Sequence, residues 1–350
     1  MKIAILINNL AIGGAEKQVV NLANNLVNEH EVDVILLNSI NSKDNIKKLH
    51  GVNINILSKN KRFSLSQLIK LKKLLDKKYD VVHAHLFPSF YYAAFLSKNK
   101  SNLIYTEHSV KNNRHNNIIM KKIDRYFLKK YNFITCVSEE AKEILINVYK
   151  LKKQEEQIHV IPNGISESLF KYKNNYKSDH IKITMVARFT DAKDYKTLIN
   201  AFSKLNKMNL TLHLVGNGEN YEETVKYVAD NNFSNIKFYG YRNDVENILE
   251  NTTIYVQSSK WESFGIAALE AMAAGIPVIH TNVDGLKDMI SNESLRFNVY
   301  DEKGLIEIIE KLIEDKEFYE NMSIICYNQA QKYKIKNVAK QYITLFEQNS

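Results

Sequence analysis

The chain has 350 residues, of which 45% are hydrophobic and 25% are charged. These proportions are typical of a folded globular protein and exclude a disordered chain, a collagen and a small disulfide scaffold. Two cysteines, Cys136 and Cys326, are too few for a disulfide framework or a four-thiolate zinc site. We find neither a signal-peptide core nor an apolar run of about 20 residues, so we expect a cytoplasmic protein without a membrane-spanning helix.

The net charge of +9 is unevenly distributed. Residues 1–172 contain 27 Lys and Arg against 15 Asp and Glu, a net of +12, whereas residues 173–350 contain 21 against 24, a net of −3. A codon bias toward lysine would produce this asymmetry. So would an anionic partner of the first half, such as a membrane, a nucleic acid or a polyanionic substrate. The composition leaves both explanations open.

Short β-rich apolar runs alternate with amphipathic stretches along the whole chain. In the first half we predict strands at 2–7, 32–37, 53–57, 80–86, 103–108, 133–138 and 158–161, with helices that include 15–28 and 65–75. In the second half we predict strands at 181–187, 211–215, 236–239, 253–257 and 277–280, followed by helices that include 302–314 and 338–347. Strands that alternate with helices indicate an α/β fold with doubly wound parallel sheets.

The polar segment 166–180 shows no hydrophobic period and predicts a boundary between two domains. We expect a first doubly wound domain over 1–166, a linker over 167–180, a second doubly wound domain over 181–332 and a C-terminal helix over 333–350. Ligands of such sheets bind outside the carboxyl ends of the strands, so functional side chains should gather there.

Residues 259–278 carry the strongest motif. They follow a strand, pass through a turn and enter a predicted helix over 263–274, which Gly275 and Pro277 end. Free backbone amides at the helix start, on Phe264, Gly265 and Ile266, predict an anion site. Glu270 lies on an otherwise apolar helix, where burial requires hydrogen-bond donors such as two neighbouring ribose hydroxyls. The alternative is that Glu270 faces solvent or pairs with a lysine.

Two cations follow the first predicted strand of the second half. Arg188 and Lys193 lie at its carboxyl end, where their charges can neutralise a diphosphate leaving group. The alternative for each residue alone is an exposed surface cation. Asp194 follows Lys193, and it either moderates phosphate affinity or caps the helix predicted after it.

The first half holds a glycine pair and three histidines near predicted strand ends. Gly13 and Gly14 lack the third glycine of a dinucleotide fingerprint, so a simple tight turn is the alternative to a phosphate-binding loop. His83 and His85 are two apart on one strand and share a face, and His108 ends the next strand. Three histidines could bind zinc, but we expect His83 to lie in the core.

The carboxylates Glu262 and Glu270 stand eight residues apart, and this segment resembles the Glu-x7-Glu signature of retaining glycosyltransferases of family 4. Other segments occur in the order of that family: Gly13-Gly14-Ala15-Glu16, Asp80–His85, Thr106–His108, Cys136–Glu139, Ile161–Ile165, Val186–Phe189 with Lys193, Val215–Gly218, and Gly240 with Asp244-Val245. The resemblance covers nearly the whole chain. One departure is Asp194, because the family usually has glycine after the lysine.

The resemblance implies the GT-B fold, in which two Rossmann-like domains face an interdomain cleft and the C-terminal helix crosses back to the first domain. It implies a nucleotide-diphosphate sugar donor, most simply a UDP-sugar, bound by the second domain, and a glycan or lipid-linked glycan acceptor bound by the first. It implies no metal ion, no cofactor and no nucleic acid. With the basic first half, a lipid-linked acceptor predicts peripheral docking on an anionic membrane through the stretches 59–78 and 111–130.

The site residues that the resemblance implies fall into three groups. The catalytic group holds the leaving diphosphate or the transferred sugar, and it comprises Arg188, Lys193, Glu262 and His108. The donor-binding group comprises Gly14, Gly216, Tyr241, Arg242, Ser263, Phe264, Gly265, Ile266 and Glu270. The acceptor side comprises Gly13, His85 and Asn163. Two alternatives stand beside this interpretation: a sugar phosphorylase that carries pyridoxal phosphate, and a non-catalytic scaffold that binds sugars or polyanions.

Overall fold

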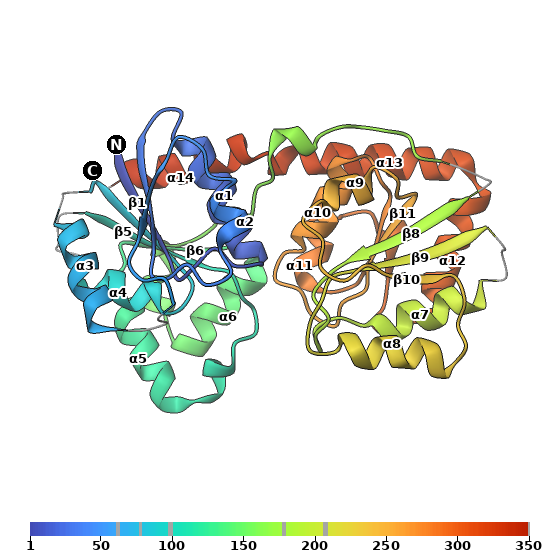
Figure 1. The fold of residues 1–350 in the computed structure, drawn as a ribbon, viewed down its shortest axis with the longest axis horizontal. Coiled ribbons are helices and arrows are strands. Elements are labelled where there is room, and N and C mark those ends of the chain that lie inside the picture. The colour runs from blue at the N-terminus through green and yellow to red at the C-terminus, as the bar shows by residue number, and fades with distance from the viewer. Residues whose placement is uncertain (61–63, 77–78, 97–100, 177–179, 206–208, 349–350) are drawn as a thin grey trace. The chain divides into compact units, whose positions relative to one another are not determined.

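A computed structural model of the chain describes residues 1–60, 64–76, 79–96, 101–176, 180–205 and 209–348. They form two compact units, the first from Met1–Ile165 with Tyr333–Ser350 and the second from Ser166–Lys332 (Figure 1). In both units parallel strands alternate with helices, which confirms the predicted α/β class. No helix among the described residues is long and apolar enough to cross a membrane.

The first unit is built on a parallel sheet with the strand order β3-β2-β1-β4-β5-β6-β7 among the described residues. Its strands are β1 (Lys2–Ile7), β2 (Glu31–Leu36), β3 (Asn53–Ile56), β4 (Val81–His85), β5 (Asn102–Glu107), β6 (Phe133–Cys136) and β7 (Ile158–Val160). Its α-helices are α1 (Gly14–Leu26), α2 (Lys43–Ile46), α3 (Leu65–Leu75), α4 (Ser89–Leu96), α5 (Ile118–Leu128), α6 (Glu139–Tyr149) and α14 (Ile335–Glu347). Figure 1 shows α1 and α14 on one face of the sheet and α3 to α6 on the other.

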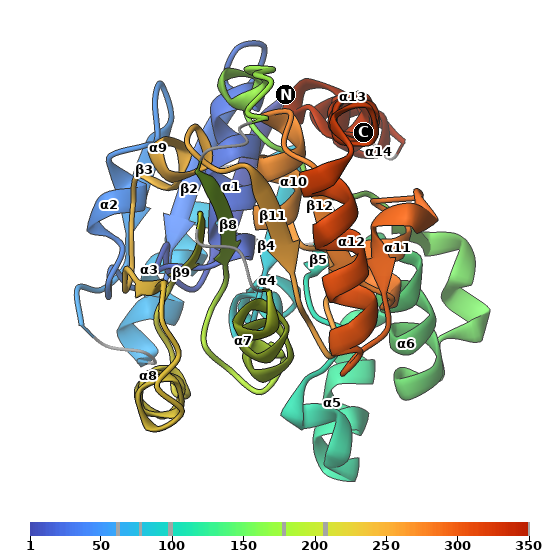
Figure 2. The ribbon, with the colours of Figure 1, turned by 90° about the vertical axis from the view of Figure 1, so that its right-hand side faces the viewer.

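The second unit has the strand order β10-β9-β8-β11-β12-β13, again parallel throughout. Its strands are β8 (Ile181–Val186), β9 (Leu210–Val215), β10 (Ile236–Phe238), β11 (Ile254–Gln257), β12 (Val278–Thr281) and β13 (Arg296–Phe297). Its α-helices are α7 (Tyr195–Lys204), α8 (Tyr221–Asp230), α9 (Val245–Leu249), α10 (Ile266–Ala273), α11 (Asp284–Lys287), α12 (Glu302–Glu314) and α13 (Lys316–Ala330). Helix α7 packs with α12, and α10 packs with α13 (Figure 2).

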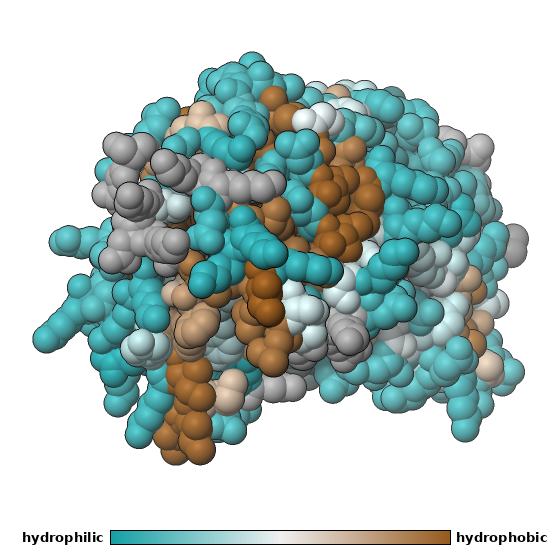
Figure 3. All heavy atoms as spheres, turned by 60° about the vertical axis from the view of Figure 1, so that its left-hand side comes forward, coloured by the Kyte–Doolittle hydropathy of each residue, from teal (hydrophilic) through white to brown (hydrophobic). Residues whose placement is uncertain are grey.

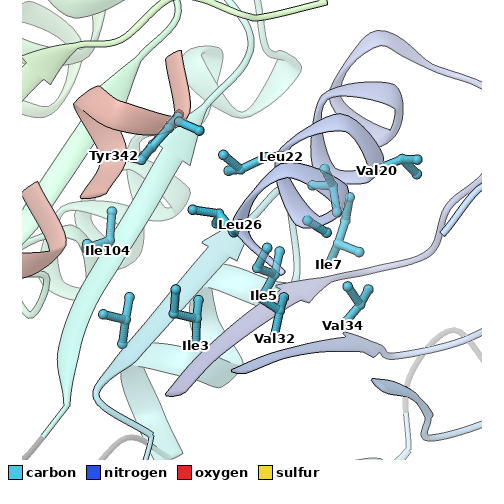
Figure 4. Packing of buried hydrophobic residues seen from close by; sticks show 14 of the residues in the cluster. Ile3, Ile5, Ile7, Val20, Leu22, Leu26, Val32, Val34, Ile104 and Tyr342 are labelled. Atoms are coloured by element: carbon cyan, nitrogen blue, oxygen red, sulfur yellow. The ribbon is translucent and has the colours of Figure 1, made fainter. Parts of the chain in front are cut away.

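The core of the first unit joins both ends of the chain. Ile3, Ile5 and Ile7 alternate along β1 and meet Leu22 and Leu26 of α1, and Tyr342 of α14 belongs to the same buried cluster (Figure 4). Burying an aliphatic side chain of this size contributes about 1.5–3 kcal/mol, so this cluster fixes α1 and α14 against the sheet.

Helix α14 is held to the first unit by polar contacts as well. The Asn102 side chain of β5 donates to the carbonyl oxygens of Leu345 at 3.3 Å and Phe346 at 3.1 Å. The hydroxyl of Tyr342 lies 3.3 Å from Thr106 Oγ1, also on β5. The C-terminal helix therefore belongs to the first unit, as the family resemblance implies.

The boundary between the units differs from the expected linker over 167–180. Its described part belongs to the second unit, and residues 177–179 lie outside the described residues. Asn175 Nδ2 donates to the carbonyl oxygens of Glu250 at 3.2 Å and Thr252 at 3.0 Å, and Tyr176 OH donates to Ile313 O at 3.0 Å. These long-range bonds order a segment whose sequence has no period. The two-residue strand β13 was likewise too short to produce a pattern.

Candidate active site

Lys193 and Glu262, two of the residues predicted to be catalytic, form an ion pair in the second unit, between the carboxyl ends of β8 and β11. Only 11% of the Lys193 side chain and 17% of the Glu262 side chain are exposed. Lys193 Nζ also donates to Ser259 Oγ at 3.1 Å. Lys193 is therefore largely buried and is not the exposed surface cation considered as the alternative, because the carboxylate and the hydroxyl compensate for its lost hydration.

A chain of hydrogen bonds supports this ion pair from β11. Gln257 Nε2 donates to Ser259 Oγ at 3.1 Å and to Glu262 Oε2 at 3.4 Å. Tyr255 OH donates to Gln257 Oε1 at 2.9 Å and is fixed against the backbone of β8 by contacts with Val186. The sequence-based site prediction did not include Tyr255, Gln257 or Ser259. A sequence signal for two of them existed: Tyr255 and Gln257 are polar side chains on the same face of a predicted strand that ends just before the motif at 259–278.

Backbone contacts place Lys193 opposite Ser259. The two residues form an isolated antiparallel bridge, and Lys260 N donates to Ala192 O at 2.8 Å. Asp194 is buried and caps α7, because its side chain accepts from Thr197 N at 3.4 Å and from Thr197 Oγ1 at 2.7 Å. Of the two roles considered for Asp194, the structure shows the helix cap.

Arg188 and Gly216 lie at neighbouring strand ends of the second unit. Arg188 is exposed two residues beyond β8. Gly216 follows β9 with φ +138, and an added Cβ would stand 1.9 Å from Ala187 O. Only glycine permits this approach, so the backbone next to Arg188 is fixed by Gly216.

Helix α10 begins at Ile266, three residues after the predicted start at Ser263. Gly265 is its N-cap in a left-handed conformation with φ +84, and its first intrahelical bond runs from Leu269 N to Gly265 O. The N–H groups of 265–268 therefore precede the first intrahelical donor, so Gly265 and Ile266 of the expected set lie at the helix start, whereas Phe264 lies before the N-cap. Phe264 is buried. The positive φ of Gly265, which the sequence pattern does not reveal, delays the helix.

Glu270 lies on the buried part of α10, with 5% of the residue exposed. It lines a cavity of about 270 Å³ with residues of α9 and of the segment 168–175. The carboxylate is therefore not a surface group. Glu262 pairs with Lys193, whereas Glu270 lines this cavity, and the pKa of the buried Tyr255 is raised by its burial and by both carboxylates.

Tyr241 and Arg242 follow β10, at the third strand end of this region. Tyr241 is 43% exposed. Arg242 makes a bidentate contact with Asp244, with Nε to Oδ1 at 2.8 Å and Nη2 to Oδ2 at 2.6 Å. This guanidinium lowers the pKa of Asp244 to about 2. Arg242 is therefore committed to a local carboxylate, and both residues are exposed.

His83, His85 and His108 of the first unit come together at the ends of β4 and β5. His85 Nδ1 and His108 Nε2 lie 3.0 Å apart, and the rings of His83 and His85 have centroids 4.1 Å apart. His83 is fully buried, as expected, and its Nε2 lies 2.7 Å from Thr106 Oγ1. Among the described residues, His108 Nδ1 and His85 Nε2 have no hydrogen-bond partner.

Burial keeps this cluster uncharged. It lowers the pKa of His83 to about 3 and that of His108 to about 4, and it holds the pKa of His85 well below its ordinary value. Neutral imidazole has one N–H donor and one acceptor nitrogen. The His85–His108 pair can therefore present a neutral donor or acceptor to a ligand near pH 7, but no positive charge.

The remaining predicted residues of the first unit lie on α1 and near α14. Gly13 is the N-cap of α1 and accepts from Lys17 N at 3.1 Å, while Gly14 is the first helical residue. Asn163 is buried beside Gly164, whose N–H donates to Gln18 Oε1 at 2.9 Å. These contacts describe a helix start and a packed turn, and they are compatible with either a structural or a binding role.

Two family models divide the chain between them. The model described as Glycosyltransferase Family 4 matches residues 12–169, and the model described as Glycosyl transferases group 1 matches residues 166–329. Their order follows the two units of the structure.

Similar proteins of known name agree with these matches. The chain is 27% identical to the Escherichia coli UDP-Gal:alpha-D-GlcNAc-diphosphoundecaprenol alpha-1,3-galactosyltransferase, over 72% of this chain and 71% of that protein. It is 25% identical to the Bacillus anthracis N-acetyl-alpha-D-glucosaminyl L-malate synthase, over 65% and 62%. Its fold is similar to that of Anabaena HepE crystallised with UDP and glucose, with a TM-score of 0.85 and 19% identity over 99% of this chain and 100% of that chain.

Proposed function

Because this chain belongs to the group 1 glycosyltransferases of family 4 and has their GT-B fold, we propose that it transfers a hexose, with retention, from a UDP-sugar to a lipid-linked glycan acceptor. The observation that carries the proposal is the buried Lys193–Glu262 pair at the strand ends of the second unit, together with the buried Glu270, which lines a cavity of the same unit. The cations Lys193 and Arg188, which both follow β8, can bind the negative charge of a diphosphate, and the buried carboxylate of Glu270 can accept hydrogen bonds from ribose hydroxyls.

In the proposed donor site, Arg188 and Lys193 stabilise the negative charge that develops on the diphosphate as the glycosidic bond breaks. The start of α10 adds backbone amides at 266–268. These groups replace a divalent cation in the proposal, so the reaction is metal-independent. Among the described residues, Lys193 and Gln257 donate to the Glu262 carboxylate, and both bind Oε2. The other oxygen, Oε1, is proposed to accept a hydrogen bond from a sugar hydroxyl. Tyr241, Ser263 and Phe264 are proposed to lie near the nucleoside.

In the first unit, His108 is proposed to hydrogen-bond a sugar hydroxyl through Nδ1, which has no partner among the described residues. Its neutral state fits this role, because an uncharged imidazole binds a hydroxyl without attracting anions. His85 would orient His108 through their 3.0 Å contact. Gly13, Gly14 and Asn163 are proposed to shape the surrounding backbone.

The test is an assay of the full-length chain with UDP-galactose, UDP-glucose and UDP-N-acetylglucosamine, after a thermal-shift screen of nucleotide sugars. The acceptor is an α-N-acetylglucosamine diphosphate on a short lipid. We expect UDP release that depends on the acceptor, an α-linked product by NMR, and full activity in EDTA. A β-linked product would overturn retention, and loss in EDTA with rescue by manganese would overturn metal independence. A donor that binds but is never cleaved would indicate a non-catalytic scaffold.

We also propose that the first unit docks on an anionic membrane through α3, α4 and α5. Several large apolar side chains on these helices are strongly exposed: Leu65 and Ile69 on α3, Phe95 on α4, and Ile118, Ile119 and Tyr126 on α5. In Figure 3 brown apolar side chains stand among teal polar ones on the side of the first unit that is turned forward. If α5 packed all of its apolar side chains inward, Ile118 and Ile119 would be buried, but each is 70% exposed.

The basic residues between these side chains provide the attraction to anionic lipid. Lys122 and Lys129 are exposed on α5 and just beyond its end, and Lys70, Lys72 and Lys73 are exposed on α3. Lys61, Arg62, Lys77 and Lys78 of the predicted basic stretch lie outside the described residues. Each basic residue near such a surface contributes about 1 kcal/mol, so a few suffice for reversible binding. The E. coli relative is named for a diphosphoundecaprenol acceptor, which supports a membrane location.

Vesicle sedimentation tests the docking. We expect binding to vesicles with anionic lipid, little binding to neutral vesicles, and release near 1 M salt, where the screening length falls to about 3 Å. Neutralising Lys121, Lys122, Arg125 and Lys129 together should reduce binding, whereas neutralising Lys226 and Lys237 of the second unit should not. Equal sedimentation with both kinds of vesicle, or with neither, would contradict the proposal.

A further inference from the structure

The first unit holds a cavity of about 260 Å³ at the carboxyl ends of β4 and β5, beside the histidine cluster. Leu86 and Phe87 come directly after β4, Glu107 is the last residue of β5, and Ser109 and Asn112 follow it. This is the strand edge at which ligands of doubly wound sheets bind. Ser109 is the residue next to His108, so the cavity adjoins the proposed sugar contact.

Aromatic side chains form much of the lining. Phe90, Tyr105 and Tyr149 are buried, and their neighbour Phe87 is 41% exposed. Arg114 lies over the Phe87 ring, with its guanidinium carbon 4.4 Å from the ring centroid. An accessible aromatic ring at a cavity with polar walls is suited to the apolar face of a pyranose ring, because such a face buries C–H groups while the hydroxyls point sideways.

Two buried carboxylates line the cavity, and their hydrogen-bond capacity differs. Asp124 Oδ1 accepts from Tyr91 OH and Arg114 Nη2, and Asp124 Oδ2 accepts from Arg114 Nε at 3.1 Å and Tyr149 OH at 3.1 Å. A carboxylate offers about four acceptor positions. Asp124 is therefore saturated, and its role is to fix Arg114 and the two tyrosines in place.

Glu107 is 8% exposed, and its hydrogen bonds with the described residues leave one acceptor position open. Its Oε2 accepts from Tyr105 OH at 3.0 Å, and its Oε1 accepts from Ser109 N at 2.9 Å and Ser109 Oγ at 2.7 Å. These three bonds use three of about four positions. Asn112 also lines the cavity. Its side-chain Oδ1 accepts from Arg114 N at 3.0 Å, so the Asn112 NH₂ group is the part of the carboxamide that can donate a hydrogen bond to a ligand.

The charge of the lining excludes an anionic ligand. Glu107 and Asp124 oppose a single guanidinium, that of Arg114, which Asp124 already binds through two nitrogens. A phosphate or carboxylate entering this cavity would meet a net negative lining without a donor cation. A ligand hydroxyl can instead donate to Glu107 and accept from Asn112.

We propose that this cavity is the subsite for the acceptor's terminal sugar and that it selects an uncharged pyranose, with Phe87 stacking on the ring and Glu107 accepting from a hydroxyl. The proposal rests on the proposed glycosyltransferase function, because it names the class of acceptor that the first unit holds. Phe87 and Glu107 are specificity-determining residues in it, and Arg114 and Asp124 are positioning residues.

Ligand-observed NMR on the full-length chain without nucleotide tests this inference. The neutral probes are the methyl α-glycosides of glucose, galactose and N-acetylglucosamine, and the anionic probes are methyl glucuronide, glycerol 3-phosphate and L-malate. We expect at least one neutral glycoside to bind, with affinity reduced about tenfold or more in Glu107→Gln, the loss expected for one charge-assisted hydrogen bond, and clearly reduced in Phe87→Ala. The matched controls Glu139→Gln and Phe95→Ala change exposed residues outside the cavity and should bind as the wild type does.

Tighter binding of an anionic probe, no binding of any neutral glycoside, or equal losses in the control variants would each overturn the inference. Failure of the proposed function is separate, because it would appear as absent UDP binding in calorimetry while glycoside binding persists. In turnover assays Glu107→Gln should raise the KM for the acceptor and leave the KM for the UDP-sugar unchanged. An equal rise in both KM values would mean that Glu107 only supports the fold.

Discussion

The two units place different groups at the carboxyl ends of their strands. The first unit has the imidazoles of His83, His85 and His108 there, and the second has the ion pair of Lys193 with Glu262. The three histidines are held neutral by burial, whereas Lys193 and Glu262 are buried almost as deeply but are paired. The comparison teaches that one architecture supports opposite electrostatic environments. Burial without a countercharge removes charge from a site, and burial with a countercharge keeps it. This difference supports our proposal that the first unit recognises sugar hydroxyls and the second recognises the donor diphosphate.

The sharpest test of this difference is Lys193→Ala. The change removes a cation from the proposed diphosphate site and leaves the Glu262 carboxylate largely buried without its partner. We expect turnover to fall about 10²-fold or more and the melting temperature to fall as well, because an unpaired buried charge is costly. Steady-state kinetics and calorimetric melting measure the two effects. Lys196→Ala is the matched control, since its ion pair with Glu223 is exposed on both sides. Turnover within twofold of the wild type would refute the assignment.

The second prediction concerns pH and the neutral histidines. The pKa of His83 is about 3 in the folded chain and about 6.5 when unfolded. The unfolded state therefore binds a proton first as pH falls, and stability is fully present above pH 6.5 and is lost below it. Between pH 7.5 and pH 5 this group should reduce the free energy of unfolding by about 2 kcal/mol. Denaturant titrations of the wild type and His83→Gln at both pH values measure it, and an identical pH dependence in the two proteins would show that His83 does not contribute.

The third prediction concerns Glu270, the buried carboxylate of the motif that lines a cavity of the second unit. Glu270→Ala should weaken UDP binding about tenfold or more, because a carboxylate that accepts from ribose hydroxyls makes charge-assisted hydrogen bonds of about 1.5–3 kcal/mol each. Titration calorimetry with UDP measures the affinity, and circular dichroism checks the fold. Glu223→Ala, at an exposed site, is the control. Wild-type affinity in a folded Glu270→Ala protein would remove Glu270 from the donor site.

The smallest predicted effect separates stability from binding next to Lys193. Asp194→Ala should reduce the free energy of unfolding by about 1 kcal/mol, because Asp194 caps α7 through Thr197. The affinity for UDP should stay unchanged, because the side chain is buried in the cap. Chemical denaturation and UDP calorimetry on the same protein distinguish the two roles. If Asp194→Ala bound UDP more tightly and kept the wild-type stability, Asp194 would instead act as a negative charge that weakens phosphate binding.

Much of the fold could be predicted from local pattern. The strands β1, β4 and β8 were found within one or two residues because fully buried parallel strands read as continuous apolar runs between polar ends. The same logic located Arg188, Lys193 and His108 at strand ends, since the carboxyl end of a strand follows directly from the end of its apolar run. Glu262 and Glu270 could also be recognised as parts of one motif, because their spacing of eight residues can be read directly from the sequence.

What the tertiary structure decided were the properties that depend on distant residues. The start of α10 moved to Ile266 because Gly265 adopts a left-handed conformation beside Leu286. The burial of Lys193 depends on Glu262 and Ser259, about seventy positions later. The capacity of Glu107 to accept one more hydrogen bond depends on which partners fill its other positions. A sequence determines which groups reach a strand end, but only packing determines which of them are paired, neutral or still available, because those states are set by neighbours across the fold.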